Sequence, residues 1–179
     1  WQAHGGPPIP GGTGPPCPSC KVSTWVELGG GASPDVNRPN IDIASISGVD
    51  ILHDLESGTI PLHDDHAERI KAIHLINHLT RDAARAILRE CYRVLQPGGS
   101  LYMMVSDLEF VVQRLAEDGI RDEWLTCVYH GPNDADRMGF HKWGYSWATI
   151  KTELETAGFS HVSHLGYYNR WEFKLEARK

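Results

Sequence analysis

A run of three glycines between two short apolar segments constrains the fold of this chain more than any other feature. Residues 25–31 read Trp-Val-Glu-Leu-Gly-Gly-Gly, and a second apolar segment at 40–44 contains Asp42. Because glycine has no Cβ, its backbone can adopt positive φ angles and lie flat against a ligand. The pattern predicts a strand, a tight turn with exposed N–H groups, and a second strand that presents an acid. This layout is typical of a nucleoside-type cofactor site at the carboxyl edge of a parallel sheet, where the acid binds a ribose.

The order of the later segments decides whether this turn is a cofactor loop or a plain connection between strands. Apolar runs with strand character are found at 24–28, 40–44, 49–53, 69–76, 100–105, 161–167 and 171–177. Helical spacing of apolar residues is found at 82–95, 108–118 and 147–157, with a loop over 119–145. Pro97, Gly98 and Gly99 are expected to end the first helix with a sharp turn. We predict an α/β three-layer domain with a mostly parallel, seven-stranded sheet and a C-terminal antiparallel hairpin.

The composition fits one globular domain with an N-terminal extension. The chain has 179 residues, a formal net charge of −6 and 41% hydrophobic residues. Residues 1–22 are rich in Gly and Pro, so we expect a disordered tail or linker there and the folded domain at 23–179. The acidic balance argues against a nucleic-acid partner, and no apolar run approaches the roughly 20 residues of a membrane span. We expect a cytoplasmic protein with a small-molecule substrate. The oligomeric state stays open, as does a lost leader, because the chain begins with Trp1.

The cysteines give a weak metal signal. Cys17 and Cys20 have the spacing of a metal-binding or redox pair, but a structural zinc site needs about four ligands, and His4 is the one extra candidate nearby. We therefore expect reduced thiols in a solvated tail and no metal, with structural zinc as the alternative. Cys91 lies within a helical pattern and is expected to be a small core residue.

Three stretches carry a resemblance to a known family. Residues 27–31, Glu-Leu-Gly-Gly-Gly, resemble the first motif of the class I S-adenosylmethionine-dependent methyltransferases, and Asp42 resembles the acid at the end of their second strand. Residues 89–101 resemble their helix–turn–strand signature, in which Arg-Val-Leu-x-Pro-Gly-Gly precedes the fifth strand. More narrowly, His-x-x-x-His at 74–78 and Gly-x-His-Lys at 139–142 are similar to a compact group of bacterial-type predicted methyltransferases.

The resemblance implies the Rossmann-like fold of those enzymes. It also implies S-adenosylmethionine as the cofactor. Glu27 would approach the ammonium group of the cofactor, and Asp42 would bind its ribose hydroxyls. The backbone of the turn would meet the methionine portion and the ribose. Asp54 and Leu55, after the third strand, would border the adenine. The residues assigned to cofactor binding are Glu27, Gly29, Gly30, Gly31, Asp42, Asp54 and Leu55.

Candidate catalytic groups follow the central strands. An oxygen or nitrogen nucleophile needs a base, and histidine suits that role near neutral pH. His78 is expected to end the fourth strand, His141 to come from a late loop over the site, and Asp107 to follow the fifth strand. Each has a structural alternative: a helix-entry residue for His78, packing of the late loop for His141, and a helix N-cap for Asp107. His74 is expected to be a core histidine.

Two departures from the family pattern bear on activity. Ser33 stands where many members have a third glycine, and Asn77 stands where many have a glutamate. We expect methyl transfer to a small-molecule or saccharide-type acceptor, at oxygen. One alternative is a non-catalytic regulatory domain that binds S-adenosylmethionine. Another is an NAD-dependent oxidoreductase. The short link containing Pro34 argues against it, because the glycine turn of such enzymes opens a full helix.

Overall fold

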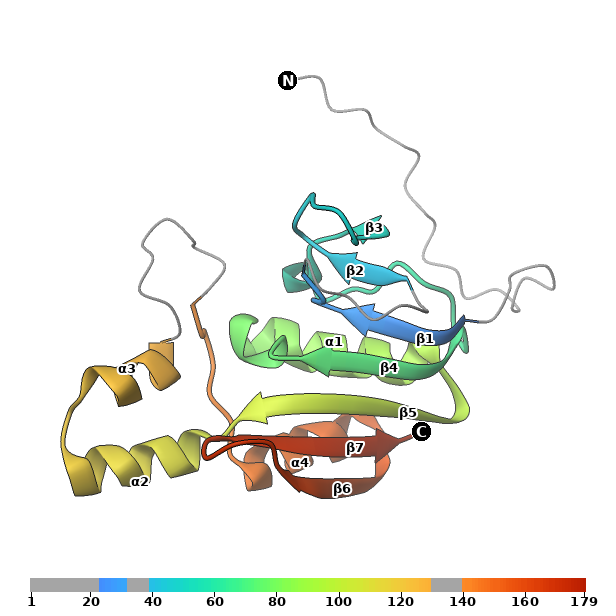
Figure 1. The fold of residues 1–179 in the computed structure, drawn as a ribbon. Coiled ribbons are helices and arrows are strands. Elements are labelled where there is room, and N and C mark those ends of the chain that lie inside the picture. The colour runs from blue at the N-terminus through green and yellow to red at the C-terminus, as the bar shows by residue number, and fades with distance from the viewer. Residues whose placement is uncertain (1–22, 32–38, 130–139) are drawn as a thin grey trace.

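The computed structural model describes residues 23–31, 39–129 and 140–179 (Figure 1). Seven strands form one sheet in the order β3-β2-β1-β4-β5-β7-β6. Their bounds are β1 Ser23–Leu28, β2 Asn40–Asp42, β3 Ile51–Leu52, β4 Ala67–Ile73, β5 Leu95–Ser106, β6 Ser160–Tyr167 and β7 Glu172–Arg178. Strands β1 to β5 are parallel, and β7 and β6 add an antiparallel hairpin next to β5. The predicted sheet is confirmed, while the expectations on residues 1–22, Cys17, Cys20 and Ser33 lie outside the described residues.

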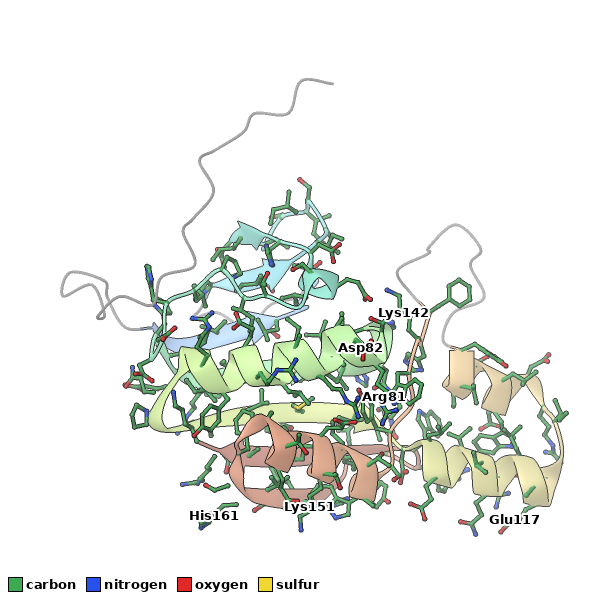
Figure 2. All side chains as sticks on the ribbon, turned by 180° about the vertical axis from the view of Figure 1, so that it is seen from behind. Arg81, Asp82, Glu117, Lys142, Lys151 and His161 are labelled. Atoms are coloured by element: carbon green, nitrogen blue, oxygen red, sulfur yellow. The ribbon has the colours of Figure 1, made fainter. Side chains whose placement is uncertain are left out.

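The helices of the described residues gather on one face of this sheet and at one of its ends. They are α1 Arg81–Val94, α2 Leu108–Asp118, α3 Asp122–Tyr129 and α4 Trp147–Ala157, with two 3₁₀ turns, η1 Leu55–Ser57 and η2 Ile76–His78. Both views place α1 and α4 on the same face, while α2 and α3 extend beyond the tip of β5 (Figures 1 and 2). None of these helices is long and apolar enough to cross a lipid bilayer.

The two faces of the sheet differ in chemistry. On β4, Ile70 and Ala72 are buried in the core, and the two-residue period of a strand turns Arg69 and Lys71 to the opposite face. There the Arg69 guanidinium lies 5.2 Å from the centre of the Trp25 ring. No helix of the described residues lies on this charged face (Figure 1).

Three predicted element boundaries were wrong, each for a local reason. The strand expected at 69–76 ends at Ile73, because His74 takes a positive φ of 53° and η2 follows, so His78 lies in a 3₁₀ turn. The loop expected at 119–145 contains α3, whose Trp124 is buried against Phe110 and Trp171. The strand expected at 100–105 begins at Leu95, because the Pro-Gly-Gly segment stays in the sheet and its Gly99 carbonyl accepts the Lys179 N–H.

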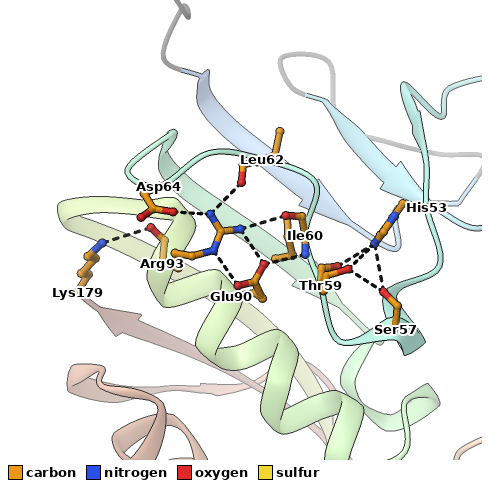
Figure 3. A network of polar contacts seen from close by, with 9 residues as sticks. All are labelled: His53, Ser57, Thr59, Ile60, Leu62, Asp64, Glu90, Arg93 and Lys179. Atoms are coloured by element: carbon orange, nitrogen blue, oxygen red, sulfur yellow. Dashed lines mark hydrogen bonds and ion pairs between the residues drawn. The ribbon is translucent and has the colours of Figure 1, made fainter. Parts of the chain in front are cut away.

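One arginine of α1 holds the loop before β4 in place (Figure 3). The Arg93 guanidinium donates to the carbonyls of Leu62 and Ile60 at 2.9 and 3.1 Å, to Asp64 at 2.6 Å, and to both oxygens of Glu90 at 2.7 Å. Burial of Glu90 opposes its charged form, but the bonds from Arg93 and from the Ile60 N–H outweigh it and lower the pKa of this carboxyl. The arginine of the helix–turn–strand motif thus has a structural role.

Replacing Arg93 with methionine is expected to lower the free energy of unfolding by about 2–4 kcal/mol, because a half-buried carboxylate and two carbonyls lose their donor. The measurement is urea unfolding followed by circular dichroism. Glu90 contributes stability above its unfolded pKa, and this contribution is lost as the pH falls through its lowered folded pKa. The variant should therefore lose less stability than the wild type on acidification. Arg89→Met, on the same helix but outside this network, should change stability by less than about 0.5 kcal/mol.

Candidate active site

The glycine turn follows β1 and is shaped by close contacts. Gly29 has a φ of 68°, and its N–H donates to the Ile41 carbonyl at 2.9 Å. A Cβ at Gly29 would lie 3.0 Å from Leu75 Cδ1, and a Cβ at Gly30 would lie 2.7 Å from Asn40 Oδ1. Only glycine fits these positions without displacing the neighbours, so the backbone of the turn is left open towards the carboxyl edge of the sheet.

Asp42 lies at the end of β2, directly beside this turn. Its Oδ2 accepts the Gly31 N–H at 2.9 Å, and its Oδ1 accepts the Ala44 N–H at 2.8 Å. Each carboxylate oxygen can accept more than one hydrogen bond, so both can still receive a hydroxyl. The structure therefore brings together the turn and the acid that the sequence assigned to one site.

Sequence reasoning missed the residue that fixes the turn, Asn40. Its fully buried side chain accepts the Gly30 N–H at 3.1 Å and donates to the carbonyls of Gly31 at 3.3 Å and Gly48 at 3.0 Å. Asn40 thus links the turn to the segment between β2 and β3. The signal in the sequence was a polar residue at the start of an apolar strand two positions before Asp42.

We expect Asn40→Ala to lower the free energy of unfolding by about 2–3 kcal/mol, because three buried hydrogen bonds are lost. The same change should weaken cofactor binding, because the turn loses its fixed shape. Chemical unfolding and calorimetric titration measure the two effects. Asn40→Asp keeps the acceptor for Gly30 but turns a buried carboxylate towards the carbonyls of Gly31 and Gly48, so it should be no more stable than Asn40→Ala. Equal affinities for all three proteins would contradict this role.

The other cofactor assignments fall at the same edge but in different environments. Glu27 is 4% exposed, and its Oε1 lies 3.3 Å from Lys71 Nζ. Asp54 is exposed and caps η1, with its Oδ1 accepting the Glu56 N–H at 2.9 Å. Leu55 is 5% exposed and belongs to the core, so any contact with an adenine would come from its backbone.

Two apolar side chains that the sequence reasoning did not single out lie near Asp42. Ile43 follows Asp42 directly and is 38% exposed. Leu52, the register partner of Asp42 on β3, is 62% exposed. Apolar side chains at a ligand edge offer a surface for a flat aromatic ring. These residues are better placed than the side chain of Leu55 to meet an adenine.

The two candidate histidines meet beyond the end of β4. His78 and His141 have ring centroids 4.9 Å apart in an edge-to-face arrangement. Nδ1 of His78 lies 3.2 Å from the Phe140 carbonyl, and Nδ1 of His141 lies 3.2 Å from the Cys127 carbonyl. A carbonyl can only accept, so in both neutral rings the proton sits on Nδ1 and Nε2 is the basic atom.

A short segment, residues 140–145, which we call the strap, carries His141 to this place. The carbonyl of Asn77 accepts the N–H groups of Lys142 at 2.7 Å and Trp143 at 3.2 Å, and the Asn77 amide donates to the Trp143 carbonyl at 3.2 Å. Lys142 also forms an ion pair with Glu56 at 2.9 Å. The asparagine that departs from the family pattern thus anchors the strap to η2.

Asp107 and His74 have structural surroundings. Asp107 caps α2: its Oδ1 accepts the N–H groups of Glu109 and Phe110, and its Oδ2 accepts the Tyr167 hydroxyl at 2.9 Å. That hydrogen bond raises the pKa of Tyr167. The N-cap alternative for Asp107 is observed, and its catalytic role stays a prediction. His74 is not the expected core histidine, because its side chain is 39% exposed and its Nδ1 lies 3.3 Å from Glu172.

Within residues 23–31, 39–129 and 140–179, no three His, Cys, Asp or Glu side chains are grouped as metal ligands would be. Cys91 is buried in the core as expected, and burial raises the pKa of its thiol.

A glycine turn beside an acid at the end of the neighbouring strand lies here in a sheet of order 3-2-1-4-5-7-6, and this fold is shared with a solved S-adenosylmethionine-dependent methyltransferase. Residues 32–103 match the sequence model of the methyltransferase domain family. The matched stretch is thus similar to a methyltransferase domain, the class for which the sequence motifs imply S-adenosylmethionine as the cofactor. No curated protein sequence matches the chain significantly.

Solved structures with the same fold support the class. A methyltransferase from Thermotoga maritima, described as a possible histamine N-methyltransferase, is 17% identical with a TM-score of 0.60, covering 88% of this chain and 82% of that one. An Archaeoglobus fulgidus methyltransferase is 12% identical with a TM-score of 0.62, covering 89% and 87%. One from Mesorhizobium loti is 17% identical with a TM-score of 0.59, covering 91% and 94%. At such identities the likeness is one of fold.

Proposed function

We propose that this domain methylates a hydroxyl oxygen of a small-molecule or saccharide-type acceptor. The observation that carries the proposal is the contact between His78 and His141, 4.9 Å apart, at the strand edge that also holds the glycine turn. A hydroxyl is a weak nucleophile until its proton is removed, and imidazole is the side chain suited to that task near neutral pH. The narrower likeness to the compact bacterial-type group is part of the same proposal.

The residues around the turn fit the cofactor. A Cβ at Gly31 would meet no described atom within 4 Å, so the turn is open at this residue, and Asp42 offers carboxylate oxygens beside it. Asp42 would hold the ribose hydroxyls, Glu27 the ammonium group, and Asp54 with the Leu55 backbone the adenine. When bound, S-adenosylmethionine supplies an electrophilic methyl group, so the protein mainly contributes position and electrostatics.

His78 is the proposed base, because its Nε2 carries the lone pair while its Nδ1–H is fixed on the Phe140 carbonyl. His141 packs edge-on against this ring and is itself fixed on the Cys127 carbonyl, so it would hold the orientation of His78 or take the proton in its place. The strap contacts His78 through the Phe140 carbonyl and through the ring of His141. Asp107 remains the third candidate, with its capping bonds intact.

One observation favours the alternative of a regulatory domain that binds the cofactor without turnover. Asn77 stands where many relatives have a glutamate, is 1% exposed, and donates its amide N–H to the Trp143 carbonyl of the strap. This position therefore supplies no negative charge to a substrate. The NAD-dependent alternative has no such support, since the sheet order and the family match are those of methyltransferases.

The test is methyl transfer from isotopically labelled S-adenosylmethionine to a panel of acceptors with saccharide hydroxyls, phenols, amines or thiols. We expect product with a hydroxyl acceptor and calorimetric binding of S-adenosylmethionine and S-adenosylhomocysteine but not of NAD. Product with amines or thiols alone would contradict the oxygen assignment. Tight cofactor binding with no product from any acceptor would favour the regulatory domain.

A further inference from the structure

A groove with arginines along one wall runs between α1 and α4, away from the cofactor edge. These helices lie side by side in front of the sheet in Figure 2, with Arg81 at one end of α1. The groove has a volume of about 600 Å³. Its walls are three arginines of α1 and three threonines with Glu153 on α4: Arg81, Arg85, Arg89, Thr149, Thr152 and Thr156. We call it the arginine groove.

The three arginines form a single row. They are spaced four residues apart, which places them on one face of the helix over a length of about 12 Å. None of them is among the residues that hold the turn, the acid or the histidine pair. One end of the groove reaches the strap, because the Arg81 guanidinium lies 4.9 Å from the centre of the Trp143 ring, while Arg85 and Arg89 lie farther along α1.

Positive charge exceeds negative charge in the groove. Glu153 is its one acidic lining residue, and it accepts two bonds of 2.8 Å from Arg85 while lying 3.5 Å from Arg81. The bond from Arg85 lowers the pKa of Glu153, so this carboxylate stays ionised. Asp82, exposed on the same turn of α1, also interacts electrostatically with Arg85. Arg89 has no acid within ion-pair distance among the described residues.

A purely structural role accounts for only part of this row. The contacts of Arg81 and Arg85 with Glu153 join α1 to α4, whereas Arg89 lines the groove without an ion pair to any described residue. The hydroxyls of Thr152 and Thr156 donate back to helix carbonyls at 3.0 and 2.7 Å. The guanidinium groups are therefore the donors that the groove offers to a ligand.

We propose that the arginine groove binds the phosphate groups of a phosphorylated small molecule. Guanidinium forks match phosphate oxygens in geometry and charge, and the volume lies within the range of small-molecule sites. An oligophosphate supplies several negative charges along a row of several cations.

The experiment titrates the full chain with inorganic pyrophosphate as the probe and measures binding by calorimetry. We expect saturable binding at one site, weaker at high salt, and unaffected by S-adenosylmethionine. Arg89→Gln should weaken this binding about tenfold, because it removes charge-assisted hydrogen bonds while leaving the α1–α4 ion pairs intact. Thermal unfolding of Arg89→Gln should match the wild type. Lys151→Gln is the matched control, since Lys151 lies on α4, pairs with Glu155 and does not line the groove (Figure 2).

Four results would overturn the proposal. They are no saturable pyrophosphate binding by the wild type, equal affinity of Arg89→Gln and wild type, displacement of pyrophosphate by S-adenosylmethionine, and equal affinity for citrate. The third would move the binding to the cofactor edge, and the fourth would assign the groove to carboxylates instead of phosphates. We expect citrate to bind at least tenfold more weakly than pyrophosphate.

Discussion

Replacing Asp42 with alanine is expected to weaken binding of S-adenosylmethionine about a hundredfold. The carboxylate has two tasks: it fixes the N–H groups of Gly31 and Ala44, and in our proposal it accepts the two ribose hydroxyls. Loss of two hydrogen bonds to a charged acceptor removes about 3 kcal/mol, which corresponds to that factor. Calorimetric titration with S-adenosylmethionine and S-adenosylhomocysteine measures it, and both ligands should lose affinity alike because both carry the ribose.

Controls separate a lost contact from a distorted turn. Asp42→Asn keeps one oxygen acceptor and should retain an intermediate affinity, whereas Asp82→Asn, an exposed acid on α1, should bind like the wild type. Asp42→Ala also leaves two N–H groups without their acceptor, so its thermal unfolding should be recorded beside each titration. A folded Asp42→Ala variant that binds within threefold of the wild type would remove Asp42 from the cofactor site.

Much of this fold could be predicted because its signals are local. The helix over 147–157 was predicted to the residue, since Ser146 caps it with Thr149 and Gly158 ends it in the left-handed region. The turn at 29–31 was predicted for the same kind of reason: glycine is needed where φ is positive and neighbours are close. The order of the strands in the sheet was not predicted, because no local signal supplies it.

What escaped prediction depends on contacts between distant residues. The end of β4 at Ile73 is set by the geometry of His74, whose N–H donates to Met104 on β5. The helix α3 is only eight residues long, and its position is fixed by Trp124 against two aromatic rings from elsewhere in the chain. Asn40 looks like an ordinary strand residue until the turn folds back on it. The arginine groove likewise exists only once α4 packs beside α1.

The larger effect on catalysis is expected at His78. Replacing it with asparagine should lower kcat about a thousandfold for a hydroxyl acceptor, because general-base catalysis contributes about 10²–10⁴-fold. Asparagine can still donate to the Phe140 carbonyl, so the strap should stay in place. Affinity for S-adenosylmethionine should change less than about twofold, since the proposed cofactor residues are untouched. Steady-state kinetics and calorimetry on the same preparation measure both quantities.

The pH dependence distinguishes a base from a structural histidine. The wild-type rate should show the limb that an imidazole base gives near neutral pH, and His78→Asn should lose that limb. His141→Asn tests whether the ring of His141 can act in place of His78. If the double variant His78→Asn/His141→Asn is no slower than His78→Asn alone, the two rings work as one unit. His161→Asn, exposed on β6, is the matched control and should leave rate and profile unchanged (Figure 2). Unchanged kcat in a folded His78→Asn variant would leave the strap histidine or Asp107 as the base, and would reduce His78 to a residue that anchors residues 140–145 at the end of β4.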